Sequence, residues 1–352
     1  MLEAVEILRQ LNAAEKAAEE KAVAIKAAAR ERQIASLLYA KLGSAGVTVD
    51  AVIASYEQVV ALDATEWDWY WLSVLYEQSG RSKENLNAAE TMLALAHAPR
   101  EQAAALERLG AVKATRGDAQ GALDAYQRSL EIAEALALAD PSSAEAKRDM
   151  SVSLNNVGRI KAAQGDAAGA LDAYQRSLEI AEALALADPS SAEAKRDVSV
   201  SLDNVGQIRA AQGDAAGALA AYQRSLEIRE ALALADPSSA QAKRDLSVSL
   251  SKVGDIKANQ GDAQGALQAY QRMFTILEAL AKADPSSARA QSDVATSHAL
   301  LWQLSSDAAS KRRHAREVDR IYSSLEQRGA HLSPGDRNNW RIIKQWLDNN
   351  PK

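Results

Sequence analysis

Three stretches of the chain share one frame: SVSLNNVGRIKAAQGD at residues 151–166, SVSLDNVGQIRAAQGD at residues 199–214 and SVSLSKVGDIKANQGD at residues 247–262. The flanking sequence repeats with the same spacing of 48 residues. The phrase GDAxGAL begins at Gly117, Gly165, Gly213 and Gly261, and the proline of ADPSSA is Pro141, Pro189, Pro237 and Pro285. A fixed period of this size predicts stacked supersecondary units, each of which buries one face on its neighbours.

Each unit is predicted to contain two helices. In the second copy, Asp166 caps a helix through AAGALDAYQRSLEIAEALALA, whose apolar residues recur every three or four positions. Pro189 ends this helix, because the residue before a proline avoids the α region. Ser190 then opens the second helix with Glu193 three residues later, which is the capping-box pattern, and Gly213 terminates it.

The overall composition fits a helical protein that works without nucleic acid or membrane. Of 352 residues, 47% are hydrophobic, yet Phe occurs once, Gly 17 times and Pro 7 times, which favours helix over sheet. The net charge of −6 argues against a nucleic-acid partner. No apolar run approaches the length of a membrane span, the first residues do not resemble a signal peptide, and cysteine is absent. We expect a cytoplasmic protein, and the alanine-rich composition suggests a bacterial one.

The repeat resembles the tetratricopeptide repeat (TPR) pattern, in which W-x-x-L-G is followed by G and then by A-x-x-x-Y/F. In one copy these positions are Leu154, Gly158, Gly165, Ala170 and Tyr174, and the same frame fits the other copies over about residues 66–285. Glycine and alanine are small where two helices cross, and the tyrosine fills the space between them. The resemblance implies an all-α, right-handed TPR α-solenoid, a superhelix of antiparallel helix pairs with a C-terminal capping helix.

The length of the repeat departs from the ordinary pattern. Common TPR units have 34 residues, whereas these have 48. The added residues lie around EALALADPSSAEAKRD, so both helices are longer at one end. The chain is in this respect similar to the extended TPR class of kinesin light chain.

The ends of the array are less regular than its middle. Residues 1–62 are predicted to form a polar N-terminal helix and a degenerate first repeat, and residues 63–292 an array of five helix pairs. Residues 293–352 are predicted to form a degenerate last repeat and a capping helix. That helix starts at Ser333-Pro334 and places Trp340, Ile343 and Leu347 on one face, which would cover the last apolar surface of a solenoid.

Catalytic and metal-binding patterns are not found in the sequence. The four histidines, His97, His298, His314 and His331, are scattered, and none is paired at a ligand spacing. No phosphate-binding or dinucleotide-binding motif occurs, and no pair of carboxylates is identifiable as an acid and a base. We therefore expect no metal, no cofactor and no enzymatic activity.

Binding is the function that remains, in one of two settings. The first is a scaffold whose concave groove holds a protein or an extended peptide segment. The alternative is a regulatory or sensor TPR region of a larger bacterial multidomain signalling or effector enzyme. An autonomous enzyme is disfavoured, because no catalytic constellation supports it.

The letters that differ between copies indicate where a partner would bind. The copies that begin at Gly117 and Gly165 differ at 5 of 48 positions, and three of the differences lie in the nine positions after SVSL. In the TPR architecture the first helix of each pair lines the concave surface, so these letters face a ligand; drift at exposed sites is the alternative explanation. The predicted contacts are Glu107, Arg108, Asn155, Asn156, Arg159, Asp203, Asn204, Gln207, Ser251, Lys252, Asp255 and Asn259.

The stretch EWDWYWLSVLY is the one aromatic concentration, and it adds Trp67, Tyr70 and Trp71 to the predicted contacts. These large apolar groups fall on the concave face, where water would leave them as an exposed patch. Two interpretations stay open. The degenerate first unit and the N-terminal helix cover them, or they anchor a partner or a second copy of the chain.

Overall fold

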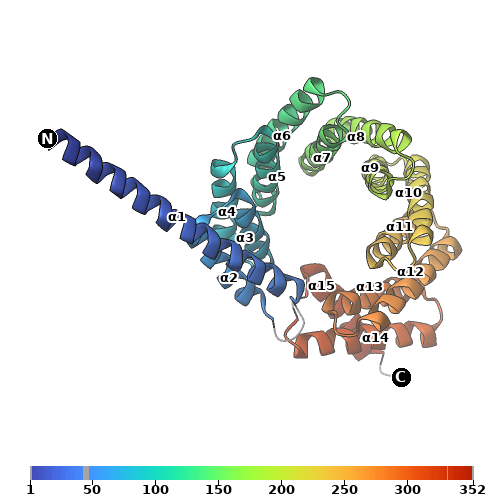
Figure 1. Cartoon of the computed structure of the whole chain (residues 1–352). Helices are drawn as coiled ribbons and strands as arrows, with labels where there is room; N and C mark the ends of the chain where they lie inside the picture. Colours follow the sequence, from blue (N-terminus) through green and yellow to red (C-terminus); the bar gives the residue numbers. More distant parts are fainter. Residues whose placement is uncertain (1, 43–46, 331, 351–352) are drawn as a thin grey trace. The chain divides into compact units, whose positions relative to one another are not determined.

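The computed structural model describes the backbone of residues 2–42, 47–330 and 332–350, and the side chains of those residues from 13 onward. In these ranges the chain forms fifteen α-helices and no β-strand (Figure 1). The all-α class that the sequence predicts is therefore confirmed. Among the described residues, no helix combines the length and the apolar character that crossing a membrane requires.

The chain divides into two compact units, residues 1–164 and residues 165–352. The first unit contains α1 (Leu2–Ala40), α2 (Val49–Asp63), α3 (Glu66–Gln78), α4 (Ser82–Leu95), α5 (Pro99–Thr115), α6 (Ala119–Ala139) and α7 (Ala144–Ala163). The second contains α8 (Ala167–Ala187), α9 (Ala192–Ala211), α10 (Ala215–Ala235), α11 (Ala240–Asn259), α12 (Ala263–Ala283), α13 (Ala288–Leu304), α14 (Ala308–Gln327) and α15 (Pro334–Asn349). The domain boundaries predicted from the sequence follow the repeat instead, and the boundary after residue 292 falls inside α13.

Within each unit, consecutive helices pack on one another as antiparallel pairs. In the second unit, α9, α11 and α13 form one layer and α8, α10 and α12 form the other (Figure 1). Each section of the core is closed by neighbouring helices: Val253 and Ile256 of α11 pack with Ala218 and Tyr222 of α10. This stacking of helix pairs is the solenoid arrangement that the 48-residue repeat predicts.

The turn inside each repeat is set by a glycine and an aspartate. Gly165, Gly213 and Gly261 have φ angles of +84°, +83° and +81°, a left-handed conformation that glycine adopts without a Cβ penalty. The following aspartate caps the next helix, as Asp166 does by accepting a hydrogen bond of 2.9 Å from the N–H of Gly169. The predicted terminator and the predicted N-cap are both confirmed.

The start of the other helix lies one residue later than the sequence suggests. Ser191, not Ser190, is the N-cap of α9, and its hydroxyl accepts from the N–H of Ala194 at 3.1 Å. The hydroxyl of Ser190 instead donates to Oδ1 of Asp188 at 2.6 Å. The capping box predicted from Ser190 and Glu193 is therefore wrong, because the side chain of Ser190 is hydrogen-bonded to Asp188 in the turn around the proline.

A glycine of the first helix of a pair lies directly against a tyrosine of the second. A Cβ at Gly206 would lie 2.6 Å from Cε1 of Tyr222, and one at Gly254 would lie 2.4 Å from Cε1 of Tyr270. Both tyrosines are buried. The close crossing that the sequence predicts is confirmed, and it explains why the frame keeps a glycine in mid-helix.

The two ends of the chain pack as the sequence indicates. The helix α1 is continuous, and its C-terminal part is attached to the rest of its unit by Arg32, whose Nε donates to Oδ1 of Asp68 at 2.9 Å. At the other end, Ile343 of α15 is buried in the last core cluster, and Trp340 and Leu347 pack against that cluster. The predicted cover of the last apolar face is therefore present in α15.

Candidate functional site

Two cavities occupy equivalent places in the repeat, one in each unit. The first encloses about 830 Å³ among α3, α5, α6 and α7. The second encloses about 380 Å³ among α11, α12 and α13. Most wall positions of the second cavity have a counterpart in the first: Arg100 and Asp149 line the first, and Arg244 and Asp293 line the second, three 48-residue repeats later.

An aromatic wall closes one side of the first cavity. Trp67, Tyr70 and Trp71 all line it, and the ring of Tyr70 meets both tryptophan rings edge-on, at centroid distances of 5.9 Å and 5.4 Å. Trp67 retains 48% of its exposure, and Val152 of α7, on the cavity wall, retains 41%. The cavity therefore offers apolar surface to a ligand at two points of its wall.

The internal cover expected for the aromatic stretch is present on a part of this wall. The ring of Tyr39, at the end of α1, lies 5.0 Å from that of Trp71, so the N-terminal helix covers Trp71. Trp67 lies outside that cover and stays half exposed. The wall thus combines an internally packed tryptophan with an open one.

Glu107 forms the polar floor of the first cavity. Its carboxylate accepts a hydrogen bond from the hydroxyl of Ser153 at 2.6 Å and another from the amide of Asn156. Burial raises the pKa of Glu107, and these two hydrogen bonds act in the opposite direction. The carboxylate therefore lines the cavity and also links α5 to α7.

Arg108, also predicted as a contact, is held just as firmly. Its guanidinium donates to Ser73 Oγ at 2.6 Å and to Asn85 Oδ1 at 3.2 Å, and forms an ion pair of 2.8 Å with Glu77. Only 10% of the side chain is exposed. Arg108 thus fixes α5 against α3 and α4 and presents little of its charge to the cavity.

At the equivalent position between α9, α10 and α11, a buried side chain takes the space. The guanidinium of Arg229 pairs with Oδ2 of Asp203 at 2.9 Å and donates to Ser199 Oγ and Ser249 Oγ, each at 3.0 Å. Asp203 is only 5% exposed, and burial raises its pKa although the charge of Arg229 acts against this shift. Asp203 is one of the ligand contacts predicted from the sequence. In the structure its side chain is buried between the helices, where its charge balances that of Arg229.

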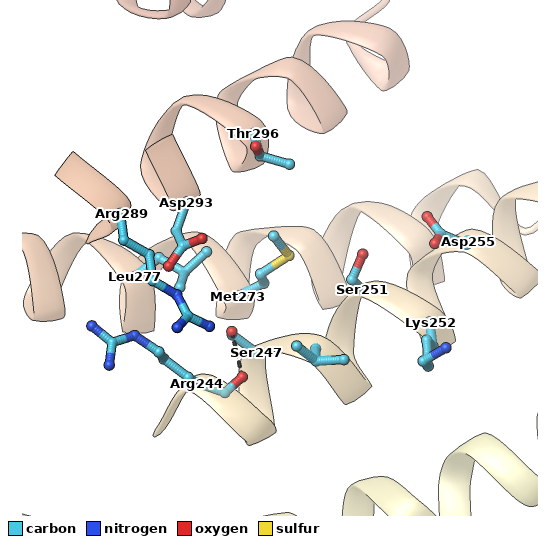
Figure 2. A pocket seen from close by; sticks show the side chains of 11 residues that line it. Arg244, Ser247, Ser251, Lys252, Asp255, Met273, Leu277, Arg289, Asp293 and Thr296 are labelled. Atoms are coloured by element: carbon cyan, nitrogen blue, oxygen red, sulfur yellow. Dashed lines mark hydrogen bonds between the residues drawn. The ribbon is translucent and has the colours of Figure 1, made fainter. Parts of the chain in front are cut away.

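The second cavity is open where Arg229 fills the previous interface. Figure 2 shows Arg244, Arg289 and Asp293 at one end of it and Lys252 and Asp255 at the other. Three of the predicted contacts line this cavity: Ser251, Lys252 and Asp255. In the first cavity the predicted contacts on the wall are Trp67, Tyr70, Trp71, Glu107 and Arg108.

The remaining predicted residues line neither of these cavities. Arg159 donates to the hydroxyl of Tyr126 at 2.8 Å, and Gln207 and Asn259 are exposed. Asn155, Asn156 and Asn204 are half-buried. A role for this group in binding stays a prediction.

The fold also brings together two histidines that the sequence does not pair. Nδ1 of His298 on α13 and Nδ1 of His314 on α14 lie 2.9 Å apart, so one nitrogen donates and the other accepts. Burial lowers the pKa of His298 to about 4, which keeps this imidazole neutral near pH 7. His298 and His314 are thus far apart in the sequence and neighbours in the fold, while His331 lies outside the described residues. In the described part of the chain, no three possible ligand side chains gather around a metal position.

Sequence reasoning missed Arg229 as well as the histidine pair. A signal for it was present, because Asp203 and Arg229 both depart from the residues one repeat earlier, Asn155 and Ala181. Two changes of opposite charge in one helix pair indicate compensation inside the wall. The spacing of the histidines carries no comparable signal, since the turn between α13 and α14 alone brings them together.

Comparison with known proteins agrees with this geometry. The tetratricopeptide repeat model matches residues 101–183 and residues 149–231, and no curated protein matches the sequence. The chain is similar to the apo form of RapI, with a TM-score of 0.53 and 15% identity over 75% of this chain and 84% of that one. It is also similar to a signal transduction ATPase with numerous domains (STAND) protein with a tetratricopeptide repeat sensor from Pyrococcus horikoshii, with a TM-score of 0.51 and 12% identity over 85% of this chain and 44% of that one.

At these identities the solved structures show the fold alone, and the family rests on the repeats themselves. The matched residues run from α5 into α10, where the glycine of one helix meets the tyrosine of the next, as at Gly206 and Tyr222. Such repeats form domains for protein interaction. Residues 101–231 of the chain are therefore tetratricopeptide repeats.

Proposed function

We propose that the chain is a non-catalytic interaction module that binds an extended peptide segment of a partner protein. The first cavity is the main anchor, and it receives an apolar or aromatic side chain of that segment. The observation that carries this proposal is Trp67, which stays half exposed on the wall of a cavity of about 830 Å³. Cavities of this size hold small ligands and side chains, and buried aromatic anchors dominate many protein interfaces.

The chemistry of the cavity supports recognition of an apolar group. Trp67 and Val152 supply exposed apolar surface, while Glu107 and Arg108 already have partners within the wall. A charged ligand group would have to compete with those partners. An apolar group would displace water from the tryptophan and the valine at no such cost.

A library of displayed random peptides, selected on the purified chain, tests this proposal. We expect selected peptides to share an aromatic or large aliphatic residue and to lose binding at least tenfold with Trp67→Ala or Val152→Asp. Leu138→Ala is the matched control, because Leu138 is 83% exposed and lies outside the cavity. Selected peptides that bind equally to wild type and to both cavity variants would place the site elsewhere. A chain that is dimeric in light scattering and becomes monomeric with Trp67→Ala would replace the peptide with a second copy.

The absence of catalysis is part of the proposal and has its own test. Turnover in a broad hydrolase and phosphatase screen, abolished by one point substitution in this chain, would contradict it.

The likeness to the STAND protein favours a second candidate, a sensor region of a signalling protein. In such a protein the repeats would bind a ligand and pass the signal to a joined domain. The reading frame that encodes this chain distinguishes the two settings. A nucleotide-binding domain in the same frame supports the sensor, and a frame that contains these repeats alone supports the separate module.

A further inference from the structure

An arginine and an aspartate link successive repeats along one edge of the helices. The arginine recurs as Arg100, Arg148, Arg196 and Arg244, and the aspartate as Asp149, Asp197, Asp245 and Asp293. Nε of Arg100 lies 3.0 Å from Oδ2 of Asp149, 49 residues further on, and Nε of Arg196 lies 2.5 Å from Oδ2 of Asp245 at the same separation. The repeated pair therefore connects one repeat to the next in both units.

The last step of this series lacks the direct ion pair, although the charges of Arg289 and Arg244 both act on Asp293. Arg244 and Asp293 stand at the same separation, but no ion pair joins them among the described residues, and the Nε of Arg244 is buried without a hydrogen-bond partner. The position four residues before the aspartate changes as well. It holds Glu145, Glu193 and Gln241 in the earlier repeats and Arg289 in the last. Glu145 pairs with Arg100, so in the last repeat a cation replaces the anion of that pair.

The cavity beside these two arginines is the space that Arg229 occupies one repeat earlier. Arg229 contacts Ser199 and Asp203, whose equivalents Ser247 and Ser251 line the cavity. Leu277 replaces Arg229 itself, and Ser251 replaces the carboxylate of Asp203. One interface thus contains a cation paired with an internal carboxylate, whereas the next lacks both members of the pair and has Arg244 and Arg289 at its edge.

We propose that Arg244 and Arg289 together bind the carboxylate of an acidic side chain on the partner segment. The inference rests on the proposed function, since it specifies a second contact of the same kind of ligand. Guanidinium groups bind carboxylates through paired, charge-assisted hydrogen bonds, and both arginines lie at one end of the cavity (Figure 2). Met273 and Leu277, which are buried, form an apolar floor for the stem of the ligand side chain.

The surroundings select an acidic side chain over other anions. The cavity has three basic and two acidic residues on its wall, so its formal charge is +1, which suits one carboxylate and not a phosphate chain. Lys252 already lies over the ring of Tyr222, with Nζ 5.4 Å from the centroid, and Asp255 already accepts from the hydroxyl of Tyr270. The lining residues of α11 and α12 lie within those helices, where backbone N–H groups are already bonded, and at the start of α13 the hydroxyl of Ser287 accepts from the N–H of Ala290.

Fluorescence anisotropy with defined peptides tests this inference on the full chain. The probe is a labelled, amidated peptide with glutamates spaced by glycine and serine, and the reference has glutamine in place of each glutamate. We expect the acidic probe to bind at least tenfold more tightly than the reference, and this preference to weaken as salt is raised. A glutamine peptide with a free C-terminus should bind as weakly as the reference.

Arg289→Glu is the decisive variant, because it restores the residue type of the earlier repeats and gives Arg244 an internal partner. It should abolish the preference for the acidic probe and keep the fold. Arg337→Glu, an equal charge change at an exposed position of α15, is the control and should retain the preference. Equal binding of acidic and glutamine probes, or equal loss with both variants, would overturn the inference. Selected apolar peptides that still depend on Trp67 would then leave the proposed function standing.

Discussion

Two neighbouring interfaces of the second unit share one frame and are filled differently. Between α9, α10 and α11, Arg229 and Asp203 form a buried ion pair that occupies the inner face. Between α11, α12 and α13, Leu277 and Ser251 stand at the same positions, and a cavity of about 380 Å³ remains. The difference teaches that residues which vary between repeats can change together on neighbouring helices. The identity of such a pair decides whether the interface between the helices is filled or contains a cavity.

The largest expected effect comes from breaking the filled interface. Arg229→Leu copies the residue of the open interface and leaves the carboxylate of Asp203 buried without its partner. Loss of one member of a buried ion pair costs about 3–5 kcal/mol. Urea denaturation followed by circular dichroism should show this loss, and hydrogen exchange should place it in α9 and α10.

The paired change is the control for that prediction. Asp203→Ser together with Arg229→Leu copies both residues of the open interface, so no charge is left buried. We expect it to recover most of the stability that the single substitution loses. If the double variant is as unstable as Arg229→Leu, the loss of stability comes from lost packing and not from the unpaired charge of Asp203.

The fold could be predicted almost completely from the sequence, because the residues that form the turns and cap the helices recur in each repeat. Gly213 and Asp166 identify a turn and a cap by their own chemistry, and the structure has both. The error at Ser190 is instructive, since two adjacent serines compete for one role. The choice depends on the hydrogen bond between Ser190 and Asp188, which the spacing of letters does not reveal.

The candidate site was less predictable, because a position on the inner face does not show whether a side chain faces a ligand or pairs with a neighbouring helix. Trp67 and Ser251 lie on cavity walls, where a ligand can reach them. Arg108 and Asp203 belong to the same predicted set, yet their charges are satisfied within the wall. The deciding partners are residues on the neighbouring helix, such as Arg229, and only the packed structure brings them together.

A third interface extends the comparison to mild acid. His298 and His314 fill the space between α13 and α14 as a neutral pair, and burial lowers the pKa of His298 to about 4. Glu278 and Glu317 favour its charged form and Arg320 opposes it, but burial outweighs them. The pKa of His298 in the folded protein lies below the ordinary value of 6.5. The stability that the folded protein gains with this imidazole neutral is therefore fully present above pH 6.5 and is lost as the pH falls towards 4.

Lowering the pH from 7.5 to 5 should therefore destabilise α13 and α14 by about 2 kcal/mol, at roughly 1.4 kcal/mol per pH unit for the shifted group. Urea titrations at both pH values measure the change, and hydrogen exchange locates it. A variant with His298→Gln and His314→Gln should lose most of this pH dependence. An unchanged dependence in that variant would assign it to other groups.

A smaller effect is expected where the two interfaces are alike. Gly254→Ala would place a Cβ 2.4 Å from Cε1 of Tyr270, and Gly206→Ala one 2.6 Å from Cε1 of Tyr222. Overpacking typically costs about 1–3 kcal/mol, and the better helix propensity of alanine offsets up to about 1 kcal/mol of it. Urea denaturation should show similar losses of about 1–2 kcal/mol for both. A loss at one site only would mean that the open cavity lets its tyrosine move.

The smallest effect is expected at a variable position that faces water. Leu234 is 81% exposed near the end of α10, and the equivalent residue on α12 is Lys282. Leu234→Lys copies that residue, and a cation in the last turn of a helix interacts favourably with the helix dipole. The urea midpoint should therefore correspond to a change within about 0.5 kcal/mol, in the stabilising direction.

Leu186→Lys provides the matched control, since Leu186 is 82% exposed at the same position of α8. Equal, small shifts at both sites would show that a letter on this edge varies independently, in contrast to Asp203 and Arg229. A loss above about 1 kcal/mol at either site would contradict this, because such a loss needs a burial that the isolated chain does not provide. It would mean that the exposed leucines contact another copy of the chain, and light scattering of wild type and variant would then differ in mass.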